Sequence, residues 1–381
     1  INDRDMGLYV LREGFDSGFL RRRFGESKGR LYDGGFLQDI DSDLELDSGD
    51  ADVPKSDLIA LATACYARDF DDRQAAIAER LDIDGFLMFM AMERICGHWD
   101  GYSLNQNNYR IYFPSKGKAV FLPHGMDQLF GDPGAGLFDP SRSLVAEAVM
   151  QSDAWRGAYQ ERLRQLVSRI DAIEAWSEKI DRMQDRLQGV LRPIDAELAS
   201  VHEERVAELK ERLAQRLEAL PRLIEEVPTP IDFHAVEGEQ VGVVALADWF
   251  PVIESEQVQC EVQDRDGAAC YAIVHAGLGD GVASWRTQTL LARGVYRWTA
   301  RIQMDSVLPI PEDPVGGVVI RSLPLVRPER WQGTHDWMEV AMEVAVTEDQ
   351  RWVEWILEMR ARHGSLWIDR DSIRLTQVRD E

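Results

Sequence analysis

A change of sequence pattern at Pro228-Thr229-Pro230 constrains the fold of this chain more than any other feature. Two prolines around a single residue resist both helix formation and strand pairing, which is typical of a linker. Before the linker, residues 143–226 carry apolar side chains at a helical spacing of three and four. After it, short segments alternate apolar and polar residues with period two. The sequence therefore predicts a helical part and an all-β part on either side of the linker.

Three regions follow from these patterns. Residues 231–381 predict a β-sandwich or jelly roll, because strand-like segments recur with glycine and proline turns between them. Residues 143–227 predict two or three antiparallel helices with a break at Pro193. Residues 1–142 are mixed, and the chain length of 381 residues agrees with several domains. We therefore expect a multidomain α+β protein.

Within the mixed region the pattern predicts several helices followed by a hairpin. The expected elements are a strand over 8–11, helices over 17–24, 56–66, 73–80 and 84–96, the last with Asp84 as N-cap, and a hairpin that turns over 115–118. Asp39, Asp41 and Asp43 mimic the start of a calcium loop, but Leu44 occupies the place of the turn glycine. We therefore interpret this stretch as a solvated acidic loop.

The charge excludes some classes of partner. The chain has 43 Lys and Arg against 67 Asp and Glu, a formal net charge of -24, which repels nucleic acids and anionic lipid surfaces. No run approaches the roughly 20 apolar residues that span a bilayer. The sequence begins without an initiator methionine or a signal-like segment, so we expect any export signal to lie upstream of Ile1. Export would fit a disulfide between Cys260 and Cys270, which flank the turn signal at 264–267.

The residues that suggest chemistry lie around the hairpin. Asp100 and Asn105 are five residues apart, which is the spacing of the protein-kinase catalytic loop H-R-D-x-x-x-x-N, and Asp127 follows the hairpin. Phosphoryl transfer needs a carboxylate to orient the acceptor and oxygen ligands that hold Mg²⁺ against the phosphates. The spacing alone also fits capping and turn-forming residues, so both interpretations stay open on the residues alone.

An ordered series of motifs resembles the CotH family of spore-coat-associated atypical kinases. The segments that carry the resemblance are 7–13, 19–25, 29–32, His98-Trp99-Asp100 with Asn105 and Asn108-Tyr109, and 123–131. It covers residues 1 to about 170 and implies a partial kinase-like domain, mostly the large lobe. It also implies that Asp100 is the catalytic aspartate, that Asn105, Asn108 and Asp127 help to ligate Mg²⁺ or Mn²⁺, and that ATP is the phosphate donor. Glu13 would lie in the hinge near the nucleotide, although an ordinary surface position is the competing interpretation.

Two departures from the family pattern bear on activity. The family's metal loop reads Pro-Trp-Asp-x-Asp, whereas this chain reads Pro123-His124-Gly125-Met126-Asp127, so its first aspartate is replaced by Gly125. Asp127 must then supply the carboxylate, or the site binds metal weakly. No glycine-rich phosphate loop or lysine-bearing strand precedes Asp100, and we expect these parts of the small lobe upstream.

Two functions remain open from the sequence. The first is a CotH-like kinase that phosphorylates Ser or Thr of a secreted or surface protein. The second is a non-catalytic surface protein, a degenerate kinase joined to a carbohydrate- or protein-binding module. The eight tryptophans beyond the linker, together with a loose resemblance to galactose-binding-like sandwiches, suggest a glycan as a further partner, although most of these tryptophans should serve packing. A carbohydrate-active enzyme is a weaker alternative, because no convincing pair of catalytic carboxylates can be assigned.

Overall fold

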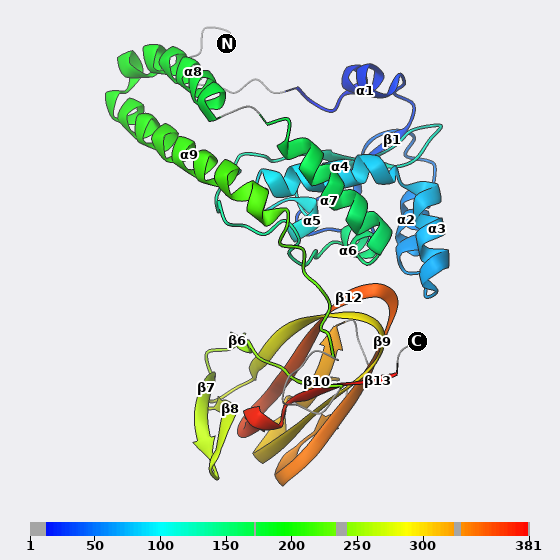
Figure 1. Ribbon diagram of the computed structural model, residues 1–381, viewed down its shortest axis with the longest axis vertical. Helices are drawn as coiled ribbons and strands as arrows, with labels where there is room; N and C mark the ends of the chain where they lie inside the picture. Colours follow the sequence, from blue (N-terminus) through cyan, green and yellow to red (C-terminus); the bar gives the residue numbers. More distant parts are fainter. Residues whose placement is uncertain (1–12, 171–172, 234–241, 324–328, 380–381) are drawn as a thin grey trace. The chain divides into compact units, whose positions relative to one another are not determined.

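The chain forms two compact units, Ile1–Val227 and Pro228–Glu381 (Figure 1). The computed structural model describes residues 13–170, 173–233, 242–323 and 329–379. The strand expected over 8–11 lies outside these residues. The chain is a multidomain α+β protein, as the sequence predicted: helices and a small sheet form the first unit, and antiparallel strands form the second.

Local capping signals define the helices in the first part of the first unit. These helices are α1 (Ser17–Phe24), α2 (Ser56–Cys65), α3 (Phe70–Arg80), α4 (Ile83–Ile95) and the short α5 (Tyr102–Asn105). The side chain of Asp16 accepts from Phe19 N at the start of α1, and that of Asp82 accepts from Gly85 N at the start of α4. The predicted N-cap Asp84 is therefore wrong by two residues, because Asp84 lies inside the first turn of α4.

A four-stranded antiparallel sheet in the order β2-β1-β3-β4 accompanies these helices. Its strands are β1 (Arg30–Asp33), β2 (Glu45–Ser48), β3 (Tyr109–Phe113) and β4 (Val120–Pro123). The predicted hairpin is confirmed, since Tyr109 pairs with Pro123 and Tyr112 with Val120. The sheet and α4 share one apolar core that contains Phe86, Tyr102 and Phe121. The loops that carry Asp100 and Asp127 therefore flank a rigid hairpin.

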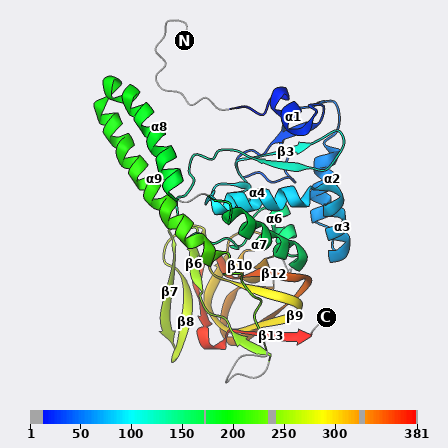
Figure 2. The same ribbon diagram turned by 45° about the horizontal axis from the view of Figure 1, so that its top comes forward.

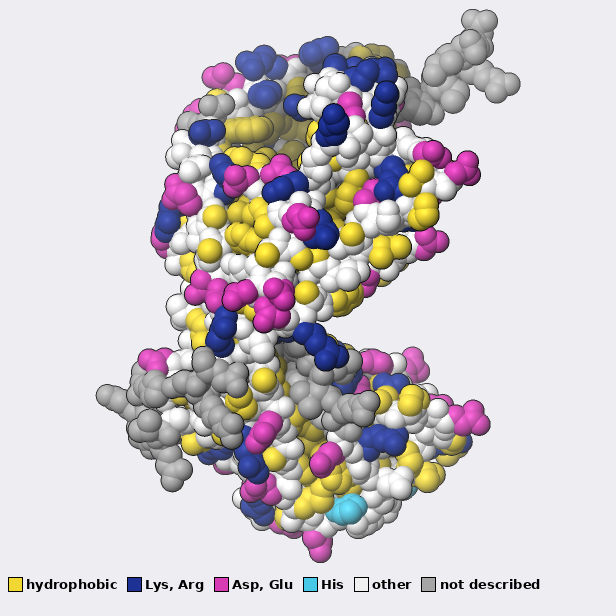
Figure 3. All heavy atoms as spheres, turned by 90° about the vertical axis from the view of Figure 1, so that its right-hand side faces the viewer, with side chains coloured by type: hydrophobic (Ala, Val, Ile, Leu, Met, Phe, Trp, Pro, Cys, Tyr) yellow, Lys and Arg dark blue, Asp and Glu magenta, His cyan; other side chains and the backbone are white. Residues whose placement is uncertain are grey.

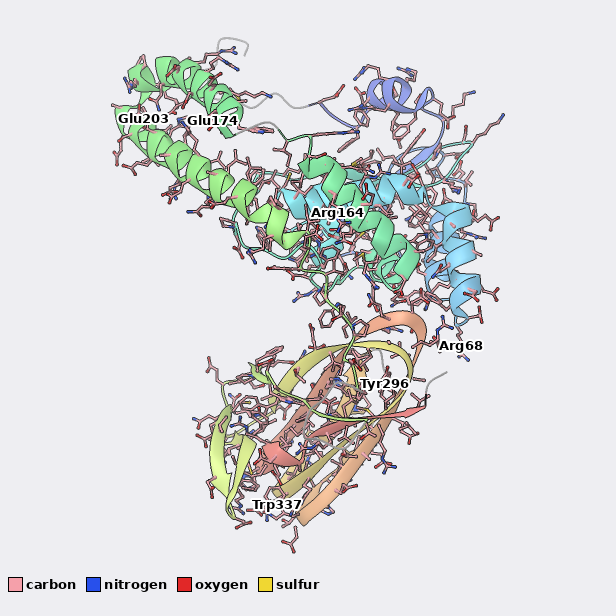
Figure 4. The ribbon with its side chains drawn as sticks, in the orientation of Figure 1. Arg68, Arg164, Glu174, Glu203, Tyr296 and Trp337 are labelled. Atoms are coloured by element: carbon pink, nitrogen blue, oxygen red, sulfur yellow. The ribbon has the colours of Figure 1, made fainter. Side chains whose placement is uncertain are left out.

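Four helices, rather than the predicted two or three, follow the hairpin. They are α6 (Leu144–Met150), α7 (Asp153–Val167), α8 (Ile173–Ile194) and α9 (Ala196–Leu223). The break near Pro193 is confirmed, because α8 ends at Ile194 and Asp195 caps α9 by accepting from Leu198 N. Arg164 on α7, labelled in Figure 4, makes two hydrogen bonds to Glu225, just beyond α9. This pair and buried apolar residues of α9 hold the end of α9 against the core of the first unit.

The second unit is a curled antiparallel sheet. Its described strands are β5 (Val243–Ala245), β6 (Phe250–Ile253), β7 (Val258–Arg265), β8 (Ala268–His275), β9 (Gly281–Pro309), β10 (Gly317–Leu323), β11 (Arg330–Trp331), β12 (Gly333–Asp369) and β13 (Arg374–Arg379). The main path runs β11-β10-β12-β9-β13-β5. The two longest strands, β9 and β12, pair along most of their length and curl (Figures 1 and 2). They enclose a core with Trp298 and Trp355 at its centre.

Cys260 and Cys270, which the sequence left as a possible disulfide, are both free thiols. The predicted turn over 264–267 is present, but Cys260 pairs with Ile273 and Cys270 with Gln263. The two cysteines are therefore three positions out of register. An odd offset places their side chains on opposite faces of the ribbon.

Most tryptophans of the second unit serve packing, as expected. Trp249, Trp285, Trp298, Trp355 and Trp367 are all buried. On the face shown in Figure 3, hydrophobic side chains are interspersed with carboxylates and basic groups. In the described part of the chain, no helix combines the length and the apolar character needed to cross a membrane.

Candidate functional site

The carboxylate of Asp100 is held by two neighbouring carboxamides. Asn107 Nδ2 donates to Asp100 Oδ1 at 2.8 Å, and Asn108 Nδ2 donates to Asp100 Oδ2 at 2.8 Å. Asn108 Nδ2 also donates to the backbone oxygen of Asp100 at 2.8 Å. Both oxygens of the carboxylate thus have a fixed donor, which orients the group without an ion pair. Such fixed orientation is what a base or a charge-stabilising group needs.

A buried glutamate on α4 supports the loop that carries Asp100. Glu93 Oε1 accepts from Tyr102 N at 2.9 Å, and Oε2 accepts from Ser103 N at 3.1 Å. A Cβ at Gly101 would lie only 2.4 Å from Glu93 Oε1, so the loop can approach this carboxylate only with glycine there. Burial raises the pKa of Glu93 to about 7 despite these backbone hydrogen bonds. Glu93 therefore positions the loop from beneath.

His98 is a packed residue beside the same loop. Its side chain is 2% exposed, and its Nδ1 lies 3.7 Å from Glu93 Oε1. Burial lowers the pKa of His98, whereas the Gly125 carbonyl and the carboxylates of Asp100 and Asp127 oppose that change. Both carboxylates thus lie within electrostatic range of one imidazole.

Gly125 packs directly on the side chain of Asn108. A Cβ at Gly125 would stand 2.0 Å from Asn108 Oδ1, and Gly125 has a φ of +54°. His124 N donates to Asn108 O at 2.8 Å, which fixes the start of the loop that carries Asp127. The absence of a side chain at 125 thus leaves room for the Asn108 carboxamide, and Asp127 is exposed further along the loop.

Asn105 and Glu13, the other residues predicted to act at the site, make different contacts. Asn105 Nδ2 donates to Trp99 O at 2.9 Å, and its Oδ1 accepts from Arg142 at 3.4 Å. It makes no hydrogen bond to Asp100. Glu13 is exposed and forms an ion pair with Arg22, also exposed. The structure brings Asn108 to Asp100, and it does not bring Asn105 or Glu13 into contact with that carboxylate.

Asn107 is a site residue that sequence reasoning missed. Its side chain is 5% exposed, and besides donating to Asp100 it accepts from Leu37 N at 2.6 Å through Oδ1. The run Asn105-Gln106-Asn107-Asn108 immediately before an apolar strand was the available signal, because four consecutive carboxamides are unusual at a strand entrance. Of this run, Asn107 and Asn108 contact the Asp100 carboxylate, whereas Asn105 contacts Trp99 and Arg142.

Asp39 corrects the prediction of a solvated acidic loop. It is 6% exposed, and it accepts from Tyr102 Oη at 2.7 Å and from Leu144 N at 2.6 Å. Gln106 Nε2 adds a bond at 3.2 Å. Burial raises the pKa of Asp39, and these hydrogen bonds oppose that rise. Asp39 therefore ties α5 and α6 together beneath the site, whereas Asp41 and Asp43 are exposed as expected.

Arg216 connects α9 to the segments around the site. Its side chain is fully buried and donates to Arg94 O at 2.6 Å, Ile95 O at 3.1 Å, Pro133 O at 3.0 Å and Ala135 O at 2.7 Å. These carbonyls belong to the end of α4 and to the segment after Asp127. A cavity of about 220 Å³ lies between them, lined by Glu93, Arg94, Gly97, Trp99, Leu104, Gly131, Asp132, Ala135, Gly136 and Asp139. Arg216 thus fixes one wall of the cavity beside the Asp100 loop.

The side chains around Asp100 offer oxygen atoms of the kind that bind hard metal cations. Across the described ranges, no group of three His, Cys, Asp or Glu side chains could hold a metal ion by itself. Asn108 Oδ1 and the Asp127 carboxylate are oxygen donors, and Mg²⁺ commonly binds through one or two protein oxygens together with phosphates and water. By ligand type, these two oxygen-bearing side chains are of the kind that Mg²⁺ and Mn²⁺ prefer.

Comparison with known proteins identifies relatives of the first unit. A family model described as CotH kinase protein matches residues 1–220. Invasin CotH7 of Rhizopus delemar is 33% identical over 111 residues, which is 27% of this chain and 19% of that protein. Spore coat protein homolog 1 of the same organism is 28% identical over 154 residues, 34% of this chain and 24% of that protein. The chain thus spans about a fifth to a quarter of the curated relatives it matches.

Solved structures resemble about a third of this chain at low identity. TmCBM61 in complex with β-1,4-galactotriose is 11% identical, with a TM-score of 0.27, over 34% of this chain and 88% of that chain. A putative sugar binding protein from Bacteroides thetaiotaomicron is 9% identical, with a TM-score of 0.25, over 34% of this chain and 87% of that chain.

Proposed function

The chain belongs to the CotH kinase protein family, and from this premise we propose that it is an atypical protein kinase that transfers phosphate from ATP to Ser or Thr. The observation that carries the proposal is the double carboxamide clamp on Asp100. Catalysis of phosphoryl transfer rests mostly on positioning and charge neutralisation. A carboxylate fixed by two neutral donors, beside a loop with a second exposed carboxylate, suits that task.

In this proposal each residue has a defined role. Asp100 orients the acceptor hydroxyl and takes its proton, while Asn107 and Asn108 keep the carboxylate in place. Asn108 Oδ1 and Asp127 would hold Mg²⁺ or Mn²⁺, and Asn105 keeps the turn after Asp100 in place through Trp99 O. The cation neutralises charge on the transferred phosphate when it is bound. Glu93 and Asp39 support the loop from the core.

Nucleotide and metal binding provide the first test. Thermal unfolding of the full-length protein is recorded with ATP and Mn²⁺ together, with each alone, and with neither. A ligand that binds only the native state raises the apparent melting temperature. We expect the largest rise with both ligands and a smaller one for Asp127→Ala, with Asp43→Ala as the exposed matched control. An equal rise of the melting temperature in wild type and Asp127→Ala would show that Asp127 does not bind the metal.

A second candidate function has its own supporting observation. Gly125 replaces the first aspartate of the family's metal loop, and Asn108 fills the space that its side chain would need. This supports a non-catalytic surface protein in which the second unit binds a glycan or a protein. That candidate predicts no thermal shift with any nucleotide and a shift with at least one oligosaccharide of a panel.

Location and acceptor follow as further parts of the proposal. The relatives are named as an invasin and a spore coat protein homolog, and the match covers only part of each. We place the protein at the cell surface or outside the cell, with a secreted or surface protein as acceptor. Detection of the protein in washed cell-surface and medium fractions tests the location, and recovery from the cytosolic fraction alone would contradict it.

A further inference from the structure

The loop of residues 34–38, between β1 and β2, presents two large apolar side chains to solvent. Phe36 is 82% exposed, and Leu37 is 56% exposed. Both side chains would gain free energy from a partner that removes them from water. We call residues 34–38 the apolar tip.

Three hydrogen bonds hold the apolar tip in place. Gly34 N donates to Tyr109 O at 3.1 Å, and Tyr109 Oη donates to Gln38 O at 3.0 Å. Between these two ends, Leu37 N donates to Asn107 Oδ1 at 2.6 Å. Leu37 has a φ of +52°, which a residue with a side chain adopts only where the surrounding contacts impose it. The tip is therefore a fixed structure that keeps two apolar side chains in solvent.

The apolar tip adjoins the candidate catalytic carboxylate. The Asn107 side chain accepts from Leu37 N through Oδ1 and donates to Asp100 Oδ1 through Nδ2 at 2.8 Å. One carboxamide group thus separates the backbone of the tip from the Asp100 carboxylate. Consecutive Cα atoms of a polypeptide are about 3.8 Å apart. The neighbours of a Ser or Thr that reaches Asp100 therefore come within side-chain reach of the tip.

Two more exposed apolar side chains lie in the segments around Asp100. Trp99 directly precedes Asp100, and Met126 directly follows Gly125, on which the Asn108 side chain packs. Together with the tip, three segments that meet around the Asp100 carboxylate each expose large apolar side chains. Exposed apolar surface beside polar groups is typical of an interaction site.

The charged side chains near these segments have both signs. Arg142 is exposed and donates to Asn105 Oδ1 at 3.4 Å, whereas Asp127 and Asp132 are exposed in the loop after β4. Charge therefore does not define one partner at this place. The apolar side chains are the feature that the three segments share.

We propose that the apolar tip binds a large apolar side chain next to the acceptor Ser or Thr of a polypeptide substrate. The inference rests on the proposed phosphotransferase function and names the class of acceptor sequence. Contact with Phe36 and Leu37 would remove apolar surface from water and would hold the acceptor hydroxyl at Asp100. A nucleotide base would instead need a concave pocket, whereas Phe36 projects into solvent.

Peptide binding to the full chain tests the proposal without any catalysis. Two labelled peptides of equal length and charge carry Ala at the acceptor position. One has Leu and Phe beside this Ala, and the other has Asn and Gln in their places. Fluorescence anisotropy should show at least about fivefold tighter binding of the apolar peptide to wild type. Phe36→Ala should abolish this preference, whereas Leu278→Ala, the control in the exposed turn between β8 and β9, should keep it.

Leu37→Gly separates side-chain contact from folding. Glycine adopts a φ of +52° without strain, so this variant should unfold near the wild-type temperature. It should nevertheless bind the apolar peptide at least about threefold more weakly than wild type does.

Phosphate transfer to the corresponding Ser peptides separates this proposal from the proposed function. Phe36→Ala should raise the KM for the apolar peptide at least about fivefold and leave the KM for ATP unchanged. Equal binding of the two peptides by wild type, or a preference that survives Phe36→Ala, overturns the proposal. A change in the KM for ATP alone also overturns it. Selective peptide binding without phosphate transfer would support the tip as a polypeptide site and overturn only the phosphotransferase function.

Discussion

Asn108 uses its two side-chain atoms for two neighbours: its Nδ2 donates to Asp100 Oδ2 at 2.8 Å, and its Oδ1 lies against Gly125, 2.0 Å from where a Cβ would stand. Asn108 therefore links two features: it holds the Asp100 carboxylate, and it fills the space beside Gly125, where the family has an aspartate. A side chain at 125 would displace the carboxamide that orients Asp100. This relationship explains why glycine at 125 and asparagine at 108 belong together.

Restoring the family's aspartate at position 125 should harm this protein. Gly125→Asp adds a Cβ against Asn108 and puts a side chain at a φ of +54°, where an L-residue costs about 1 to 2 kcal/mol. Gly125→Ala, the matched control, should lose nearly as much free energy of unfolding in urea, since the Cβ alone causes the clash. Addition of Asn108→Gly to Gly125→Asp should recover part of the loss. A Gly125→Asp variant as stable as wild type would contradict the packing.

Asn107 should contribute to both stability and function. Asn107→Ala removes the hydrogen bonds to Asp100 Oδ1 and from Leu37 N, one of them to a charged acceptor, which we expect to cost about 1 to 3 kcal/mol of unfolding free energy. Asn107→Asp keeps the acceptor for Leu37 N but sets a second carboxylate against Asp100. Urea denaturation should therefore show a larger loss for Asn107→Asp at neutral pH than at pH 4. The same loss at both pH values would argue against the contact with Asp100.

Glu93 should make the protein less stable as pH rises. Burial raises its pKa from 4.5 to about 7, so the folded state binds a proton more tightly than the unfolded state. The stabilisation is complete below pH 4.5 and is lost as pH rises through 7, a change of roughly 3 kcal/mol for such a shift. Because burial also raises the pKa of Asp39, the quantity to measure is the difference in unfolding free energy between wild type and Glu93→Gln. A difference independent of pH between 4 and 8 would exclude this role.

Arg216 should matter far more than an exposed arginine on the same helix. Burial lowers its pKa, and its guanidinium satisfies four backbone carbonyls. Arg216→Met removes these four hydrogen bonds from the interior, and we expect a loss of about 3 to 5 kcal/mol of unfolding free energy. Arg222→Met removes an exposed ion pair with Glu226 and should cost less than about 1 kcal/mol. Similar losses for both variants in urea denaturation would contradict this difference.

Sequence reasoning succeeded where local signals determine structure. Helix α1 was predicted over its observed residues because apolar spacing defines it, with Asp16 before it and Gly25 after it. The β3/β4 hairpin was also predicted, since a turn-forming run separates two apolar segments. The break near Pro193 follows from the geometry of proline itself.

The missed features depend on contacts between distant residues. Asn107 is recognisable as a site residue only through Leu37, 70 residues away, and through the loop that Glu93 supports. Asp39 is buried because Tyr102 and Leu144 reach it from later elements. The possible Cys260–Cys270 disulfide is excluded by the strand register: the tight turn pairs Arg265 with Ala268, and this pairing sets Cys260 opposite Ile273. The spacing of residues along the sequence does not reveal contacts such as Asn107 with Leu37, or Asp39 with Leu144.

The central proposal is that Asp100 is the catalytic aspartate of a phosphotransferase. Transfer of labelled phosphate tests it most directly. The full-length protein is incubated with γ-labelled ATP, Mn²⁺ and a degenerate set of Ser- and Thr-containing peptides, and label in peptide and protein is counted. We predict incorporation by wild type and a loss of at least about 10²-fold for Asp100→Ala, the usual scale for a proton-transfer group. Asp41→Ala, an exposed aspartate away from the loop, should retain wild-type incorporation. Equal incorporation by wild type and Asp100→Ala, or none by wild type, would contradict the proposal.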